Sequence, residues 1–534
     1  VVAVRSSRAA TTPAAVPAAA APAVPLSWAV RLRWIGLAFL PSSLMLGVTT
    51  YLSTDVAAVP LLWIVPLAVY LATFIVAFSR RWSPLTLLAR RGLPVLVLPA
   101  LIAMGLTYGI GQPVAVIIGL HLVALLGVGM AAHGRLADER PPVERLTEFF
   151  LLISVGGVLG GLFNALIAPV VFNSLIEYPI VLLAALLACT PRFHGLRRRV
   201  AGLSIGVLPA AVLFVAPLVV GYLLRGADVH PAGVTLVALA VTPLAVVGYR
   251  VAERPARVIL AVSLVALAIL PGAQPSLHTE RTFFGVHRVN DADGFRQLAH
   301  GTTVHGAQSL DPDEAHRPTT YYSQDGPVGD VMASRDGAGR IGGVGLGTGA
   351  IAAYAAAGQP MTFFEIDPAV VRIAQDDRLF TFLSGSRGDI DIVVGDGRLS
   401  LTEEPDASFD VLVLDAFSSD AVPVHLLTRE AVDLYRSKLA PGGVMAFNIS
   451  NRHLDLGPVL GGIAGELGLS GLTALDGGDG TRAHNASEWV VLADDSAALQ
   501  DLGGGDGWSP LDTRPGGRVW TDDFSNILRT VRWW

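Results

Sequence analysis

The sequence predicts a protein of two parts: an N-terminal multi-pass α-helical membrane domain and a C-terminal α/β domain with a doubly wound sheet. Three observations predict this fold class. Long apolar runs recur through the first half, the composition changes near residue 276, and short apolar strands alternate with helical patterns from residue 340 onward. Between the two parts, residues 276–334 have the turn-rich pattern of a small β-rich lead-in.

The composition favours a part that is not solvated by water. Of the 534 residues, 52% are hydrophobic and only 15% are charged, whereas soluble chains carry about 25% charged residues. The net charge of −6 is mild, so nucleic acid is not an expected partner. The single cysteine, Cys189, excludes a disulfide or a cysteine-based metal site within one chain, and we expect no metal.

Residues 1–27 are rich in alanine and proline and are predicted to form a disordered tail. Residues 28–275 are predicted to form a transmembrane domain of about eight or nine helices, because several apolar runs approach the ~20 residues that span hydrocarbon. Buried core helices are the alternative, but nine such runs leave no amphipathic faces to meet water. The runs are 34–53, 56–78, 93–110, 113–131, 149–171, 178–190, 200–224, 233–249 and 256–273, the sixth and ninth being short.

The loops that join these runs are alternately rich and poor in arginine. By the positive-inside rule, the arginine-rich loops are cytoplasmic. We therefore expect a multi-pass protein of the cell membrane. If all nine runs span, residues beyond 275 lie outside the cell; if the short ninth run does not, they lie inside. The arginines stand at 31, 33, 80, 81, 90, 91, 135, 140, 145, 192, 197–199, 250, 254 and 257.

Two features of the membrane half concern packing and function. The small residues of SVGGVLGG, 154–161, predict closely packed helices. His133, Glu148, Asn164 and Glu177 fall near the ends of apolar runs. They lie either at the membrane interface, where charge costs little, or at a functional site.

The C-terminal part, residues 335–534, has the pattern of strands and helices that predicts a parallel, doubly wound sheet. RIGGVGL is the first strand, GTGAIAAYAAAG a helix, and TFFEID the second strand; DIDIVVGD, FDVLVLD, GVMAFNIS and SEWVVLAD follow as strands. Such sheets bind ligands outside the carboxyl ends of their strands. We therefore expect the functional residues at those ends.

The first strand runs into a glycine-rich loop, GVGLGTG, which allows a ligand to approach the backbone. Its glycines, which we assign to cofactor binding, are Gly343, Gly345, Gly347 and Gly349. Alone, this loop would serve a nicotinamide cofactor equally well. The second strand ends in Glu365, where an acid can accept from ribose hydroxyls, and the third ends in Asp396, where an acid can accept from an adenine amino group.

A third acid, Asp415, ends the apolar strand VLVLD, and a second carboxylate, Asp420, follows in the loop AFSSDAVP. Three acids behind a glycine loop without a basic residue suit a nucleoside with a cationic sulfonium better than a pyrophosphate. The alternative is that these are solvated strand-end acids, or that Asp415 caps a helix or braces the loop. Three histidines in the lead-in, His300, His305 and His316, are spaced too irregularly for a metal site, and we expect structural or substrate-facing roles.

These residues resemble the membrane-fused spermidine synthase-like family, in which a membrane half precedes a Rossmann-like, methyltransferase-type domain. The resemblance covers nearly the whole chain after residue 27. In the membrane half it rests on LAFLPSSLMLGVTTYLSTDVAAVPLLWIVPLAVYL and LTEFFLLISVGGVLGGLFNALIAPVVF. In the second half it rests on GFRQLAHGTTVHGAQ, RPTTYYSQDGPVGDV, LDAFSSDAVPVHLLTREA, LAPGGVMAFNISNRH and WTDDFSN.

The resemblance implies transfer of an aminopropyl group from decarboxylated S-adenosylmethionine to putrescine or a related amine. Glu365 would then hold the ribose and Asp396 the adenine. Asp415 would be the catalytic acid beside the attacking amine, because an ammonium must lose a proton before it attacks carbon. The substrate-binding residues would be Asp420, Gln308 and Tyr322.

Two departures from the family pattern leave alternatives open. Thr348 stands where the family's glycine loop usually carries an aspartate, and DAFSSDAVP moves the second acid two positions along the chain. An S-adenosylmethionine-dependent methyltransferase and a polyamine-binding or transport membrane protein are the alternatives. The expected partners are a small amine and the lipid bilayer, and homo-oligomerisation is left open. Because the donor is made in the cytoplasm, we expect the catalytic domain to face the cytoplasm.

Overall fold

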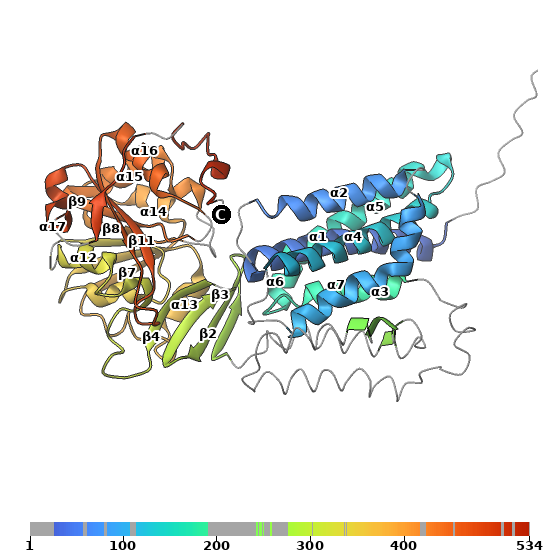
Figure 1. Ribbon diagram of the computed structural model, residues 1–534, viewed down its shortest axis with the longest axis horizontal. Helices are drawn as coiled ribbons and strands as arrows, with labels where there is room; N and C mark the ends of the chain where they lie inside the picture. Colours follow the sequence, from blue (N-terminus) through green and yellow to red (C-terminus); the bar gives the residue numbers. More distant parts are fainter. Residues whose placement is uncertain are drawn as a thin grey trace, which may run out of the picture.

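A helical bundle and an α/β domain lie beside one another in the computed structural model (Figure 1). The structure describes residues 26–56, 61–79, 83–106, 114–190, 242–243, 245–247, 249, 257–258, 276–301, 303–335, 337, 339–416, 423–451, 454–503, 507–514 and 518–532. Residues 1–25 of the predicted tail, the apolar run 200–224 and most of the runs 233–249 and 256–273 lie outside these residues.

The described bundle contains four helices that are long and apolar enough to cross a membrane, at Trp28–Ser53, Pro84–Met104, Val114–Asp138 and Val143–Val171, and two shorter apolar ones. The expectation of eight or nine helices stays a prediction, because its last three runs are largely outside the described residues. The helices are α1 (Trp28–Thr50), α2 (Ile64–Phe78), α3 (Ser83–Leu106), α4 (Val114–Asp138), α5 (Leu146–Leu162), α6 (Ala168–Val171) and α7 (Glu177–Cys189), with π-helical turns at Tyr51–Val56 and Phe163–Ile167.

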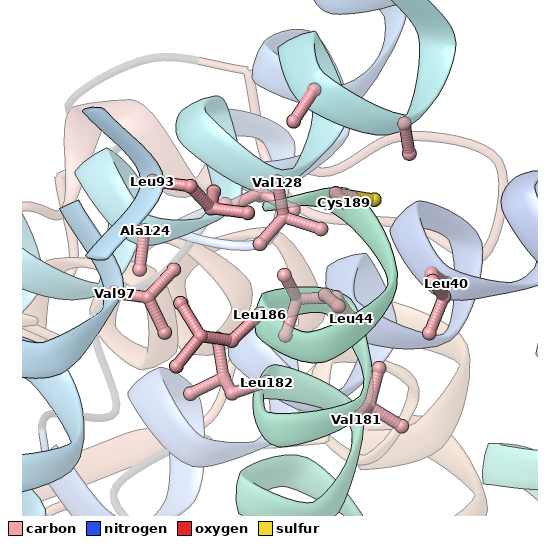
Figure 2. Close-up of a cluster of buried hydrophobic side chains, with 14 of the residues drawn as sticks. Leu40, Leu44, Leu93, Val97, Ala124, Val128, Val181, Leu182, Leu186 and Cys189 are labelled. Carbon is pink, nitrogen blue, oxygen red and sulfur yellow. The ribbon is translucent and has the colours of Figure 1, made fainter. Parts of the chain in front are cut away.

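The core of the bundle joins side chains from α1, α3, α4, α5 and α7. Figure 2 shows Leu44 of α1, Val97 of α3, Val128 of α4 and Leu182 of α7 in one apolar cluster, and all four are fully buried. Cys189 belongs to the same cluster. Its burial in the core gives this thiol a packing role.

Small residues bring α5 close to α1, as the segment 154–161 predicted. A Cβ added to Gly156 would lie 2.4 Å from the carbonyl oxygen of Ile35, and one added to Gly160 would lie 2.8 Å from that of Phe39. Their neighbours Gly157 and Gly161 meet nothing within 4 Å. The contact with α1 therefore requires glycine on one face of α5 only, which confirms the prediction of close packing.

The lead-in forms a four-stranded antiparallel sheet, and its first strand is tied to the bundle. Arg281 donates to both carboxylate oxygens of Glu177 at 2.8 and 3.0 Å and to the carbonyl oxygen of Ser174 at 2.7 Å. Both charged side chains are buried. The strands, in the order β1-β2-β3-β4, are His278–Arg281, Val286–Ala292, Phe295–His300 and Thr303–Ser309.

An eight-stranded mixed sheet forms the centre of the α/β domain. Its order is β12-β10-β11-β9-β8-β5-β6-β7. The strands are β5 (Ile341–Val344), β6 (Pro360–Glu365), β7 (Asp389–Val394), β8 (Phe409–Leu414), β9 (Leu439–Asn448), β10 (Ser470–Asp476), β11 (Ser487–Ala493) and β12 (Trp508–Pro510). The helices that accompany them are α12 (Pro327–Ala333), α13 (Pro368–Gln375), α14 (Gly397–Glu403), α15 (Arg429–Lys438), α16 (Gly457–Leu467) and α17 (Gln500–Gly503).

The prediction of a parallel sheet is correct for β5 to β9 and wrong beyond them. SEWVVLAD, expected to continue the parallel pattern, is β11 and pairs antiparallel with both β9 and β10. A parallel neighbour needs a crossover of a dozen or more residues. Only the ten residues 477–486 separate β10 from β11, and they contain no helix, so the chain reverses direction there.

The helix predicted over GTGAIAAYAAAG is also wrong. The segment forms a short 3-10 turn, Ala350–Tyr354, and leaves it extended at Ala355. The carbonyl oxygen of Ala352 accepts from the N–H of Ala355 and from the Ser386 hydroxyl. These tertiary contacts end the helical path after one turn and override the high helix propensity of alanine.

Candidate active site

A cavity of about 270 Å³ lies at the carboxyl ends of the parallel strands, where the lead-in sheet packs against them. Its walls come from the glycine loop after β5, the ends of β6 and β8, the start of α14 and the lead-in strands. The polar residues that line it are His287, His300, His305, Tyr321, Tyr322, Glu365, Asp367, Asp396, Asp415 and His425.

Two of the four predicted glycines line this cavity, Gly345 and Gly347. Both have left-handed backbones, with φ of 95° and 55°. A Cβ on Gly345 would lie 2.3 Å from the carbonyl oxygen of Asp415, and one on Gly347 would lie 2.6 Å from that of His305. Any side chain would collide there, so the loop presents bare backbone to the cavity.

The other two glycines have packing roles. Gly343 lies within β5, where a Cβ would lie 2.8 Å from the Phe363 ring. Gly349 caps the 3-10 turn with φ of 81°, and a Cβ there would lie 2.9 Å from Leu383. Neither residue lines the cavity.

Glu365 ends β6 and braces the glycine loop. Its Oε2 accepts from the backbone N–H of Leu346 at 2.9 Å, and its Oε1 accepts from that of Asp367 at 2.8 Å. The side chain is 8% exposed and lines the cavity, and burial raises the pKa of its carboxyl. Each carboxylate oxygen has a second lone pair, so Glu365 fits the role of accepting from two ribose hydroxyls.

Asp396 caps the first turn of α14. One oxygen accepts from the backbone N–H of Leu399 at 3.0 Å, and the other lies 3.2 Å from Nε2 of His425. The residue lines the cavity. A cap that leaves its second oxygen beside the cavity can also accept from a ligand amino group.

Asp415 follows β8, and two side chains hold its carboxylate. The Tyr322 hydroxyl donates to Oδ2, and the Asn448 amide donates to Oδ1 at 3.0 Å. The backbone N–H of Asp415 donates to the carbonyl oxygen of Val344 at 2.9 Å, which fixes its main chain to β5. Burial raises the pKa of this carboxyl to about 6, although both hydrogen bonds oppose the rise.

Five residues of this site were not predicted from the sequence: His287, Tyr321, Asp367, His425 and Asn448. Asn448 ends β9 as Asp415 ends β8, so a polar residue after an apolar strand was the available signal. His287 and Asp367 join the lead-in to the sheet, with Nε2 of His287 2.7 Å from Oδ2 of Asp367. The two residues are 80 positions apart in the chain, and a local sequence pattern cannot predict a contact at that separation.

The remaining predicted residues are placed differently. Tyr322 lines the cavity, as described. Gln308 does not: its amide donates to the carbonyl oxygen of Ala315 and to the Thr381 hydroxyl, both at 2.8 Å, and its carbonyl accepts from the N–H of Thr381. Gln308 thus braces a loop, and this geometry does not favour a substrate contact. Asp420 lies outside the described residues.

Comparison with known proteins gives a partial match. No model of a known protein family matches the chain. A stretch of 110 residues is 32% identical to the polyamine aminopropyltransferase of Vibrio vulnificus (strain CMCP6), covering 20% of this chain. The matched stretch spans 36% of the length of that relative.

Solved structures that match part of this chain include a probable spermidine synthase, a spermidine synthase and a methyltransferase. A probable spermidine synthase from Corynebacterium glutamicum ATCC 13032 is 18% identical with a TM-score of 0.36, over 48% of this chain and 99% of that one. Spermidine synthase from Thermotoga maritima is 13% identical with a TM-score of 0.32, over 42% and 75%. A SAM-dependent methyltransferase from Archaeoglobus fulgidus is 13% identical with a TM-score of 0.23, over 32% and 96%.

The geometry of Glu365 predicts that it is required for nucleoside binding. Glu365→Gln keeps the shape but turns an amide N–H toward the backbone N–H of Leu346 or Asp367. We expect affinity for 5′-methylthioadenosine to fall by about 1.5–3 kcal/mol, the size of a hydrogen bond to a charged group. Titration calorimetry measures this, with Glu403→Gln on the exposed face of α14 as the control. Equal affinities in the two variants would remove Glu365 from the binding site.

Proposed function

We propose that this protein is a membrane-bound aminopropyltransferase that transfers the aminopropyl group of decarboxylated S-adenosylmethionine to putrescine or a related amine. The observation that carries the proposal is the Asp415 carboxylate, held by Tyr322 and Asn448 beside a glycine loop and Glu365. The partial identity to a polyamine aminopropyltransferase supports the same activity.

The charge of the cavity suits two cationic substrates, a sulfonium donor and an ammonium acceptor. Four carboxylates line it, and none of its described lining residues is a lysine or an arginine. In the reaction the acceptor nitrogen bonds to the methylene carbon next to sulfur, the carbon–sulfur bond breaks, and methylthioadenosine leaves. The carboxylates are Glu365, Asp367, Asp396 and Asp415.

Asp415 is the base in this proposal. The acceptor must lose a proton before its nitrogen lone pair can attack, and a carboxylate within hydrogen-bond reach can take that proton. With a pKa of about 6, Asp415 is ionised at neutral pH yet more basic than an exposed aspartate. Tyr322 and Asn448 fix both oxygens, so the carboxylate is oriented before the acceptor arrives.

A methyltransferase that uses S-adenosylmethionine is the second candidate. It is favoured by Thr348, the residue at the place of the glycine-loop acid. Thr348 has no carboxylate, and it is completely buried and does not line the cavity. The glycine loop therefore offers no acid to the amine of a donor. A polyamine-binding or transport protein would bind the same ligands without turning them over. Incubating the purified protein with each donor and putrescine, followed by mass spectrometry of the products, separates the three.

Asp415→Asn tests the catalytic assignment. The substitution keeps the shape and removes the base, so we expect kcat to fall by a factor of about 10²–10⁴. Donor affinity should change no more than a few-fold, since Glu365 and Asp396 carry that contact. Asp433→Asn on the exposed face of α15 is the matched control. A kcat for Asp415→Asn within about threefold of the parent would end the claim that Asp415 is the base.

The helical bundle spans the bilayer in this proposal. Its four long helices have suitable length and composition, and large apolar side chains cover its outside. Leu71, Ile75, Leu151, Val158 and Val170 are between 50% and 84% exposed. Such a surface would be unstable in water and is satisfied by lipid.

The two ends of the bundle differ in charge, and this favours one orientation. At one end, arginines of α1, α3 and α4 pair with acids of α4 and α5; at the other, Glu177 receives Arg281 of the lead-in. Arg135 donates to the carbonyl oxygen of Ala188 at the far end of α7, about 16 Å along the helix from Glu177. The pairs at the arginine end are Arg31–Glu148, Arg33–Glu139, Arg90–Asp138 and Arg135–Glu139.

By the positive-inside rule the arginine end is cytoplasmic. The α/β domain, attached at the Glu177 end, then lies outside the cytoplasm. This is opposite to the orientation expected from the site of donor synthesis, and the donor must then be supplied on the outer side.

Cysteine labelling tests this orientation. In a Cys189→Ser background, Asp512→Cys reports on the α/β domain and Val143→Cys on the arginine end, and both positions are exposed. We expect a membrane-impermeant maleimide to label Asp512→Cys in intact cells and Val143→Cys only after lysis. The reverse pattern would place the α/β domain in the cytoplasm.

A further inference from the structure

Three histidines form a row along the cavity wall that the lead-in sheet provides. They come from neighbouring strands of the lead-in: His287 of β2 pairs in register with His300 of β3, and His305 lies on β4. The ring centroids of His287 and His300 are 5.5 Å apart, and those of His300 and His305 are 6.0 Å apart. All three line the cavity, whereas His316 is exposed and does not.

Each ring in this row has a buried nitrogen without a hydrogen-bond partner among the described residues. These atoms are Nδ1 of His287, Nε2 of His300 and Nε2 of His305. His287 and His300 are only 6% and 4% exposed. A buried polar atom without a partner is costly, so three of them in one cavity point to a ligand that supplies the missing hydrogen bonds.

Asp367 determines which atom His287 offers. Its Oδ2 accepts from Nε2 of His287 at 2.7 Å and from the Thr282 hydroxyl at 2.6 Å. Because a carboxylate accepts, Nε2 carries the proton of that hydrogen bond, and in the neutral form of the ring Nδ1 is the acceptor. The His300 ring packs directly against Gly285, where a Cβ would lie 2.0 Å from Nε2 of that ring, so only glycine leaves room for His300 in the row.

The histidine row lies next to Thr348, the residue of the glycine loop that stands in place of the expected acid. Thr348 is covered by β4, and a Cβ on Gly306 would lie 2.4 Å from its hydroxyl oxygen. His305, the residue before Gly306, lines the cavity instead. The surface that could meet a donor tail is therefore provided by the lead-in sheet.

The ligand chemistry follows from charge. Burial lowers the pKa of His300 to about 4 and that of His305 to about 3, so both rings are neutral at physiological pH. Neutral rings beside four carboxylates disfavour an anionic group and favour a cation. An alkylammonium has three N–H donors and no acceptor, so it suits neutral ring nitrogens, which accept.

We infer that His287, His300 and His305 form a subsite that holds the terminal ammonium of an alkylamine, in place of the missing glycine-loop acid. The inference rests on the proposed aminopropyl transfer. Two substrates carry such a group, the aminopropyl tail of the donor and the diamine acceptor, and the experiment below distinguishes them.

Titration calorimetry with three nucleosides tests the subsite: decarboxylated S-adenosylmethionine, its propyl analogue without the terminal amine, and S-adenosylmethionine. We expect the parent to bind the amine-bearing donor at least about tenfold tighter than the propyl analogue. A single hydrogen bond to a charged group is strong enough to give this difference in affinity. His305→Phe should lose most of this preference while its affinity for the propyl analogue stays within about twofold. His305→Gln, which retains an acceptor, should keep part of it, and His316→Phe should match the parent.

Putrescine titrated into the methylthioadenosine complex forms the second arm. If His305→Phe weakens putrescine and leaves the donor preference unchanged, the row holds the ammonium of the acceptor and the subsite stands. Unchanged values in both arms would overturn the subsite alone, as would a parent that prefers S-adenosylmethionine with its carboxylate. A parent that binds none of the nucleosides would overturn the proposed function together with the subsite.

Discussion

The hydrogen-bonded carboxylate of Asp415 is the constraint on which the rest of the site depends. A carboxylate withdrawn from water is costly unless donors replace its hydration, and the two donors here come from distant segments. Tyr322 follows the lead-in sheet, and its carbonyl oxygen accepts from the Tyr354 hydroxyl at 2.6 Å, which ties it to the turn after the glycine loop. Asn448 ends the neighbouring strand β9 and also accepts from the backbone N–H of Ser450. The acid is therefore positioned only when the lead-in and the parallel strands have both docked.

The same lead-in connects the site to the bundle through consecutive residues. Arg281 forms the buried ion pair with Glu177, and Thr282 donates to Asp367 in the cavity wall. Phe284, two residues further on, lines the cavity itself. Removing one partner from a buried ion pair is costly, because the other charge is left unpaired. The hairpin that closes one side of the cavity is thus fixed by the helical bundle, which gives the bundle a structural role in the site.

The sequence predicted those parts of the site in which a polar residue ends an apolar strand. Glu365, Asp396 and Asp415 follow β6, β7 and β8, and parallel strands bring such ends to one edge. Features that depend on distant contacts were not predictable in this way. The alanine-rich residues after Gly349 form only a 3-10 turn, because the Ser386 hydroxyl donates to one of their backbone carbonyl oxygens. Strand β11 runs antiparallel because its connection to β10 is too short for a crossover. Gln308 looked like a substrate residue, but the partner that occupies its amide, Thr381, is 73 residues away.

The most direct test of this account is the pH dependence of kcat/KM in the parent and in Tyr322→Phe. In the proposed reaction Asp415 can act as the base only when ionised, so kcat/KM should fall as the pH drops below its pKa of about 6 and level off above it. The Tyr322 hydrogen bond stabilises the ionised form, and its loss should raise the pKa and move the acid limb to higher pH. Superimposable profiles, or a parent profile without an acid limb near pH 6, would contradict the claim that the Tyr322-bound carboxylate of Asp415 accepts the proton.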